Sequence, residues 1–147
     1  MFVVEAVAGW IGESTGLLAD SLDMLADATV YGIGLYAVGR PLIAKARAAF
    51  TSGVLQIVLG VGVLVDVARR FLVGSEPIST LMIVVGAVAL IANVTGLLLI
   101  AKYRQGGVHM RASWIFSKND VLANLGVILS GVLVIVLGSR FPDLVIG

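Results

Sequence analysis

The sequence predicts an all-α fold, a polytopic bundle of membrane helices that forms a single transmembrane domain over residues 1–147. Of these residues, 59% are hydrophobic and 13% are charged, whereas soluble domains average about 45–50% apolar and about 25% charged residues. The hydrophobic residues gather into long runs separated by short polar linkers. Runs of about 20 apolar residues cross a bilayer as helices, so we expect an integral membrane protein.

The expected helices follow one another along the whole chain. Met1–Ile11 is apolar but extends only about 16 Å, so we interpret it as the latter half of a first helix. Four runs reach or approach the spanning length: Thr15–Val38, Ala49–Val65, Ile78–Ala101 and Ala112–Leu137. Pro142–Gly147 is interpreted as the start of a sixth helix, because proline suits a first helical turn. We therefore expect about five transmembrane segments, in a domain clipped at both ends.

Basic residues are distributed unevenly between the two ends of this bundle. The linkers after the second and fourth helices hold Arg40, Lys45, Arg47, Lys102, Arg104 and Arg111. The opposite end holds Arg69, Arg70 and Arg140. The positive-inside rule places the richer end in the cytoplasm, and the protein is predicted to lie in a cytoplasmic (inner) membrane.

Composition also disfavours several classes of function. The net charge is +1, so the basic footprint of a nucleic-acid-binding protein is absent. The chain has no cysteine and a single histidine, His109, so a metal site would consist mainly of oxygen ligands. No nucleophile–base pair is apparent. We therefore expect neither an enzyme nor a resident cofactor.

Three aspartates lie within the second predicted helix, where each charge at mid-membrane costs about 2.5–3.5 kcal/mol on insertion scales. At 100° per residue, Asp20, Asp23 and Asp27 share one helix face within about 60°. Like charges four residues apart repel, so either one carboxyl group is protonated or a cation lies between them. Such oxygen pairs suit a divalent metal. For Asp20, a hydrogen bond to nearby backbone is an equal alternative.

A polar stripe in the fifth predicted helix reaches the same depth. Ser113, Ser117, Asp120 and Asn124 share one helix face within about 60°. Asp120 lies about 13 Å from the cytoplasmic end of that helix, similar to the aspartates of the second helix. Two helices are therefore expected to bring carboxylates to one level.

Other polar residues are candidates for supporting roles. Asp20, Ser117, Asn124 and Glu5 are candidate accessory polar or proton-relay residues. Lys118, a further charge within a membrane segment, either pairs with Glu5 or extends to the membrane interface.

The remaining polar and small residues favour packing roles. Asn93 is expected to form an interhelical hydrogen bond, and Gly53 and Gly60 are expected to let helices approach closely. Asp66 and the two arginines beside it are expected to form a solvated cluster near an interface.

Two stretches resemble signatures of the cation diffusion facilitator (cation efflux) family. Ser14–Asp27 resembles the second-helix signature, in which His or Asp and then an Asp four residues on open the transport site; Asp23 and Asp27 match them. Arg111–Gly126 resembles the fifth-helix signature, a His and an Asp four residues apart, and Asp120 matches the Asp. The resemblance covers nearly the whole chain and implies that these three aspartates bind the metal.

The resemblance also implies a function and partners. A divalent metal ion would be exported from the cytoplasm while protons move inward, and a homodimer in membrane lipid is expected. Elementary chemistry agrees, because carboxylates that alternate between metal-bound and protonated forms avoid bare buried charge.

The sequence departs from the family pattern at Phe116, which stands where the fifth-helix His is expected. The site therefore looks like three carboxylates, completed by Ser117, Asn124, water or a neighbour. Fewer nitrogen ligands widen the expected cargo from zinc to Zn²⁺, Mn²⁺, Fe²⁺, Co²⁺ or Cd²⁺. From the resemblance we expect that the family's sixth helix is missing beyond its start, and that the ferredoxin-like domain that often follows, which is associated with dimerisation, is missing too, as in short relatives with a Ser-Lys/Arg-Asn-Asp fifth helix.

Two alternatives come from other classes of protein. The first is a non-transporting membrane subunit whose buried acids pair with Lys118 or a partner chain and serve assembly. The missing His and the short chain motivate it. The second, a membrane enzyme with paired carboxylates, is the weakest hypothesis.

Overall fold

The computed structural model describes residues 1–101 and 108–146, and for residues 34 and 108–113 it describes the backbone alone. The helices in these ranges are α1 (Phe2–Ile11), α2 (Thr15–Ala37), α3 (Leu42–Val73), α4 (Ser79–Ala101), α5 (Val108–Leu137) and α6 (Phe141–Ile146). No strand occurs in the described ranges, so the predicted all-α fold is confirmed.

Within the part of the chain that the structure describes, three helical segments are long and apolar enough to cross a membrane: Leu42–Val73, Ser79–Ala101 and Trp114–Leu137. α2 has the same length as α4, 23 residues, but carries three aspartates. The prediction of an integral membrane helix bundle is therefore confirmed.

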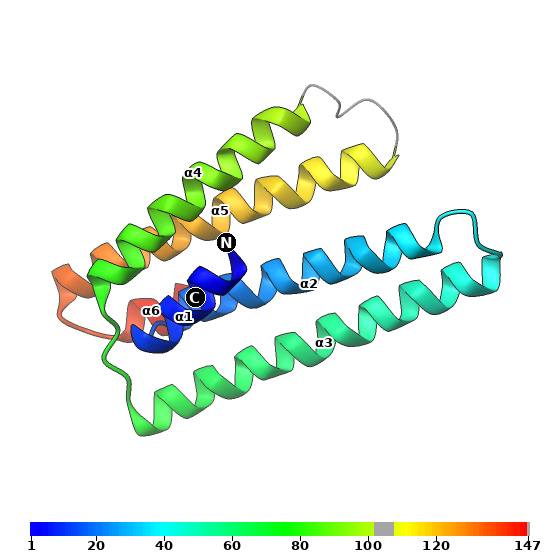
Figure 1. Cartoon of the computed structure of the whole chain (residues 1–147). Helices are drawn as coiled ribbons and strands as arrows, with labels where there is room; N and C mark the ends of the chain where they lie inside the picture. The colour runs from blue at the N-terminus through cyan, green and yellow to red at the C-terminus, as the bar shows by residue number, and fades with distance from the viewer. Residues whose placement is uncertain (102–107, 147) are drawn as a thin grey trace.

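The bundle consists of two antiparallel helix pairs, α2–α3 and α4–α5, with the short helices α1 and α6 near one end (Figure 1). The most extensive contact lies between α4 and α5, followed by those of α2 with α3 and α1. α1 also packs on α4, and α6 packs on α5, α2 and α3. The two pairs diverge toward the end where α2 turns into α3 (Figure 1).

The third helix is much longer than predicted. We expected Ala49–Val65, but α3 has 32 residues and extends about 48 Å. Lys45 and Arg47, assigned above to a linker, lie in its first turns. Hydropathy detects only the apolar part of a helix, whereas Lys and Arg continue a helix almost as well as Ala.

The first turn of α2 is held by a residue from the other end of the chain. Ser14 caps the helix, and its Oγ accepts a hydrogen bond from the Leu17 backbone N–H at 3.2 Å. The fully buried Asp143 carboxylate of α6 accepts from the Ser14 hydroxyl at 2.8 Å. It also accepts from the backbone N–H groups of Thr15 at 2.6 Å and Gly16 at 3.1 Å. A carboxylate here satisfies free N–H groups and complements the positive end of the helix dipole.

Close helix approach depends on glycines other than those predicted. A Cβ atom on Gly53 or Gly60 would meet nothing within 4 Å. Within a single copy of the chain neither glycine lies against another helix, so the prediction of close approach at these two was wrong. At Gly9 of α1 a Cβ would lie 2.8 Å from the backbone nitrogen of Leu18 in α2. At Gly131 of α5 it would lie 3.0 Å from Cβ of Met82 in α4. Periodicity alone does not show which face of a helix meets a neighbour.

Replacing Asp143 by Asn is expected to lower the free energy of unfolding by about 1–3 kcal/mol, since an amide NH₂ would then face backbone N–H donors. Thermal unfolding in detergent, followed by circular dichroism, measures the change. Glu76→Gln, an exposed acid in the α3–α4 linker, is the matched control. Equal midpoints for both variants would contradict the capping role.

Gly9→Ala and Gly60→Ala are expected to shift stability in opposite directions. The new Cβ at position 9 would press on rigid backbone of α2 and cost about 1–3 kcal/mol. At position 60 it would enter open space and stabilise the helix by up to about 1 kcal/mol. The same unfolding assay checks both, and a destabilised Gly60→Ala would show that this face of α3 is packed.

Candidate functional site

The acidic stripe of α2 is buried at one end and open at the other. Asp20 is 5% exposed, Asp27 is half-buried and Asp23 is exposed. Asp20 and Asp23 line a cavity of about 200 Å³ together with Ala123 and Val127 of α5. The stripe therefore lies on the side of α2 that is directed toward α5.

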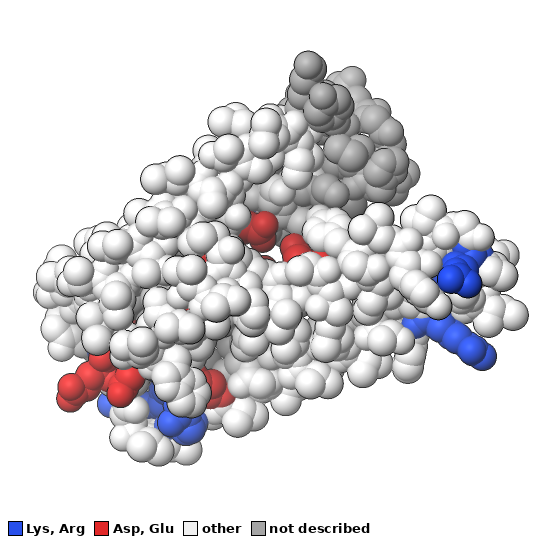
Figure 2. All heavy atoms as spheres, in the orientation of Figure 1, with Lys and Arg blue, Asp and Glu red and all other residues white. Residues whose placement is uncertain are grey.

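Asp120 completes the acidic group from α5. It is half-buried, and its carboxylate interacts electrostatically with those of Asp27 and Asp23. Figure 2 shows acidic side chains in the hollow between the α4–α5 pair and α2. The fold thus brings these carboxylates from two helices into one region.

The carboxylates approach one another without forming a closed cage. Within the described residues, no three side chains of His, Cys, Asp or Glu are close enough to hold one metal ion together. The divergence of the two helix pairs (Figure 1) accounts for this spacing. A metal held by all three would therefore require α2 and α5 to move closer.

A hydrogen-bonded chain of three side chains crosses the bundle beside this group. The Asn124 side-chain nitrogen donates to the Asp20 carboxylate, and the Asn93 side-chain nitrogen donates to Asn124 Oδ1 at 2.9 Å. Asn124 is fully buried. The chain joins α2, α5 and α4, so Asp20 bonds to a side chain rather than to nearby backbone.

Glu5 and Lys118, the two remaining charged candidates, differ in their burial and in their contacts. Glu5 is 0% exposed, and both its carboxylate oxygens lack a hydrogen-bond partner among the described residues. Lys118 is exposed, and its ammonium nitrogen lies 5.2 Å from the centroid of the Trp114 ring. In the described ranges the ion pairs are those of Asp66 with Arg69 and Arg70. The proposed pairing of Lys118 with Glu5 or another buried acid is therefore wrong.

Two aromatic rings form a contact between α2 and α5 near the acidic group. Phe116 of α5 contacts Tyr31 of α2 edge-to-face, with ring centroids 6.3 Å apart and an angle of 86° between the planes. Ser117 lies half-buried beside Phe116, while the side chain of Ser113 lies outside the described residues. The position where the family signature has His is thus an apolar contact between α2 and α5.

Asp23 is accessible from two sides of α2. Besides the cavity shared with α5, it lines a second one of about 200 Å³ between α2 and α3, with Gln56 and Gly60. The carboxylate therefore borders open space on both flanks, which a ligand that enters and leaves requires.

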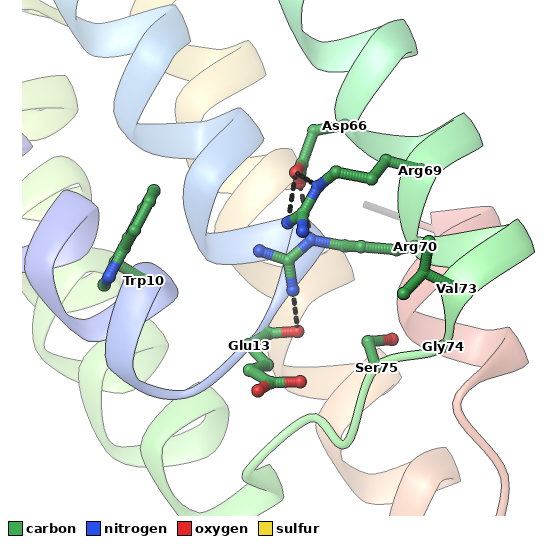
Figure 3. Close-up of a pocket in the computed structure, with 8 residues that line it drawn as sticks. All are labelled: Trp10, Glu13, Asp66, Arg69, Arg70, Val73, Gly74 and Ser75. Carbon is green, nitrogen blue, oxygen red and sulfur yellow. Dashed lines mark hydrogen bonds and ion pairs between the residues drawn. The ribbon is translucent and has the colours of Figure 1, made fainter.

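A second polar cluster, at the end of α3, is structural. Arg70 is 4% exposed and donates to the Asp66 carboxylate at 2.5 Å and to the Glu13 carbonyl. Figure 3 shows its guanidinium between these groups, beside a cavity of about 480 Å³ that Trp10 also lines. The expected solvated cluster is thus wrong for Arg70, because a bidentate guanidinium satisfies a buried carbonyl and a carboxylate together. Arg69 is exposed as expected.

Sequence reasoning missed the connection of Asn93, Asn124 and Asp20 as one chain. The available signal was an amide at position 93 within an otherwise apolar 23-residue helix. It also missed Asp143, which the segment Phe141–Ile146 brings beneath α2.

Comparison with known proteins gives a consistent result. Residues 44–146, more than half of the chain, match the family described as the cation efflux transmembrane domain. That range includes Asp120 but not the aspartates of α2. No solved structure matches the chain.

Two similar proteins extend the match to α2. Zinc transporter ZitB of Yersinia pseudotuberculosis is 25% identical over 92% of this chain and 48% of its own length. A cadmium, cobalt and zinc/H(+)-K(+) antiporter of Bacillus velezensis is 23% identical over 96% of this chain and 50% of its own length. The chain spans about half the length of these relatives.

Asn124→Ala is expected to lower the free energy of unfolding by about 1–3 kcal/mol, because it leaves the buried Asp20 and the half-buried Asn93 without their shared partner. Thr95→Ala is the control, since the Thr95 hydroxyl is exposed and bonds only the Ile91 carbonyl of its own helix. Chemical or thermal unfolding in detergent compares the two. Equal unfolding free energies for the two variants would show that the hydrogen bonds of Asn124 do not stabilise the fold.

Proposed function

Because the chain belongs to the cation efflux family, we propose that it transports divalent metal cations across a membrane and exchanges them for protons. The observation that carries the proposal is the group of Asp23, Asp27 and Asp120, which α2 and α5 bring into electrostatic contact inside an apolar bundle. The names of the relatives, zinc in one and cadmium, cobalt and zinc in the other, indicate the class of cargo.

In this proposal the three carboxylates are the metal ligands. They offer oxygen atoms alone, and Phe116 supplies no ligand, so the site would accept Mn²⁺, Fe²⁺, Co²⁺ or Cd²⁺ as well as Zn²⁺. Ser117, Asn124 or water would complete the coordination. Asp20 is engaged by Asn124, so its role would be to position α5 against α2.

Metal binding would also change the conformation. The acids do not form a cage in the described residues, so a divalent ion would draw α2 toward α5 by offsetting the repulsion among three negative charges. When the metal leaves, protons would take its place, because bare carboxylates in an apolar bundle are unfavourable.

Direction of transport follows from charge. Figure 2 shows basic side chains at both ends of the bundle; at the end where α2 turns into α3, which holds Arg40, Lys45 and Arg47, no acidic side chain lies beside them in this view. The helix pairs diverge toward that same end (Figure 1). The positive-inside rule places this end of the bundle in the cytoplasm. The opening between the helix pairs would then admit cytoplasmic metal to the acids. We infer export across a cytoplasmic (inner) membrane.

Lipids and a second copy of the chain are the proposed surroundings. α3 contacts only α2 and α6 among the described helices and exposes large apolar side chains such as Phe50, Ile57 and Leu64. Lipid chains, and in a homodimer the partner copy, would cover them.

Calorimetric titration of Zn²⁺, Mn²⁺, Fe²⁺, Co²⁺ and Cd²⁺ into the protein in detergent at pH 6 and pH 8 tests the site. Binding is expected to be tighter at pH 8, because ligands must be deprotonated. We expect weaker metal binding in each of three variants, Asp23→Asn, Asp27→Asn and Asp120→Asn. The loss of affinity should be at least about tenfold, which corresponds to about 1.4 kcal/mol of binding free energy.

Glu76→Gln is the matched control and should bind as the unaltered chain does. If Asp23→Asn, Asp27→Asn and Asp120→Asn all retained full affinity and transport into proteoliposomes, the carboxylate site would be refuted. The assembly role would then explain the acids.

A further inference from the structure

Glu5 is the one carboxyl group inside the bundle that is both fully enclosed and unpartnered among the described residues. It lies in α1, and it is 0% exposed. Neither of its oxygens has a hydrogen-bond donor in the described part of the chain. By contrast Asp20 and Asp143, equally buried, each accept from a named donor. An ionised carboxylate without any donor is among the most unfavourable groups that an apolar interior can hold.

The charges that face Glu5 make its ionised form still less favourable. Asp20 of α2 and Asp120 of α5 are both acidic and both act on it. Among the described residues, the positive group that acts on it is the amine of Met1. α4, which also packs on α1, contains no ionisable side chain. Lys118 is occupied at the Trp114 ring.

A metal ion is a poor occupant of this position. No three acidic or imidazole side chains of the described residues gather around one point. A proton needs only one carboxyl oxygen, and it removes the charge outright.

We propose that Glu5 is a proton-binding residue of the transport cycle, separate from the metal ligands. In the conformation described here its carboxyl group is neutral. This inference rests on the proposed metal transport and names the group that carries a proton against the metal. Release is dissociation of the O–H bond, which leaves the electron pair on Glu5; because Glu5 is fully buried in this conformation, water accepts the proton in a conformation that exposes the carboxyl group.

The position of Glu5 explains how metal binding would trigger that release. A divalent ion held by the ionised carboxylates of Asp23, Asp27 and Asp120 lowers their summed charge from −3 to −1, and the weaker repulsion favours the ionised form of Glu5. Metal binding at α2 and α5 and proton loss from α1 are thereby coupled without a shared ligand. In reverse, protonation of Glu5 favours metal release.

Infrared spectroscopy with labelled glutamate tests the protonation directly. The chain has three glutamates, Glu5, Glu13 and Glu76, and the latter two are exposed. In protein labelled with ¹³C-glutamate, we expect a carboxylic-acid C=O band at pH 6 that Glu5→Gln abolishes and Glu76→Gln retains. Absence of that band in the unaltered protein would overturn the proposal, whether or not any variant folds.

The coupling to metal is measured on the same samples. Zn²⁺ is expected to diminish the band, and calorimetry in buffers of different ionisation enthalpy should show about one proton fewer released per metal in Glu5→Gln. An unchanged proton count with intact Zn²⁺ affinity would overturn the role in transport. If Zn²⁺ does not bind at all but the band is present, the metal function fails while the proton-binding residue stands.

Discussion

The structure depends on one constraint, the lack of water inside a membrane bundle. Every buried polar group there must find a partner in the protein, a cation or a proton. Asp143 finds three donors at the start of α2, and Arg70 finds a carboxylate and a carbonyl. Glu5 has no hydrogen-bond partner among the described residues, and Asp23, Asp27 and Asp120 repel one another. These four are therefore the groups that cations and protons are left to neutralise.

The hydrogen-bonded contacts of Asp143 and Arg70 lie at one end of the bundle. At the end near α1 and α6, the contacts of Asp143 and Arg70 tie α2 to α6 and α3 to the α1–α2 turn. Toward the other end the two helix pairs diverge (Figure 1), and an edge-to-face contact of Phe116 with Tyr31 connects α5 to α2 there. One end is thus held by hydrogen bonds and the other by apolar contact. Such a bundle can rock about its bonded end, as alternating access requires.

The sequence predicted the fold class and the helix that carries the acids, because long apolar runs and a 100° periodicity are local properties. It also placed Asp120 at the depth of Asp27. It failed where an outcome depends on neighbours: the ends of α3, the burial of Arg70, and the close approach at Gly9 instead of Gly60. Of the two alternatives for Lys118, the pairing with Glu5 rested on charge alone and is wrong, because the exposed Lys118 lies at the Trp114 ring. Which face meets which helix is a tertiary fact, and no pattern within one segment contains it.

We propose that a divalent metal draws α2 and α5 together through their carboxylates. The chain has no cysteine, so spin labels can be placed at Leu35→Cys of α2 and Ile115→Cys of α5, both exposed positions. Pulsed electron paramagnetic resonance would then measure the distance between the labels with and without Zn²⁺. The account predicts that Zn²⁺ shortens this distance and that Asp120→Asn removes the change. A distance that stays the same while Zn²⁺ is bound would contradict it.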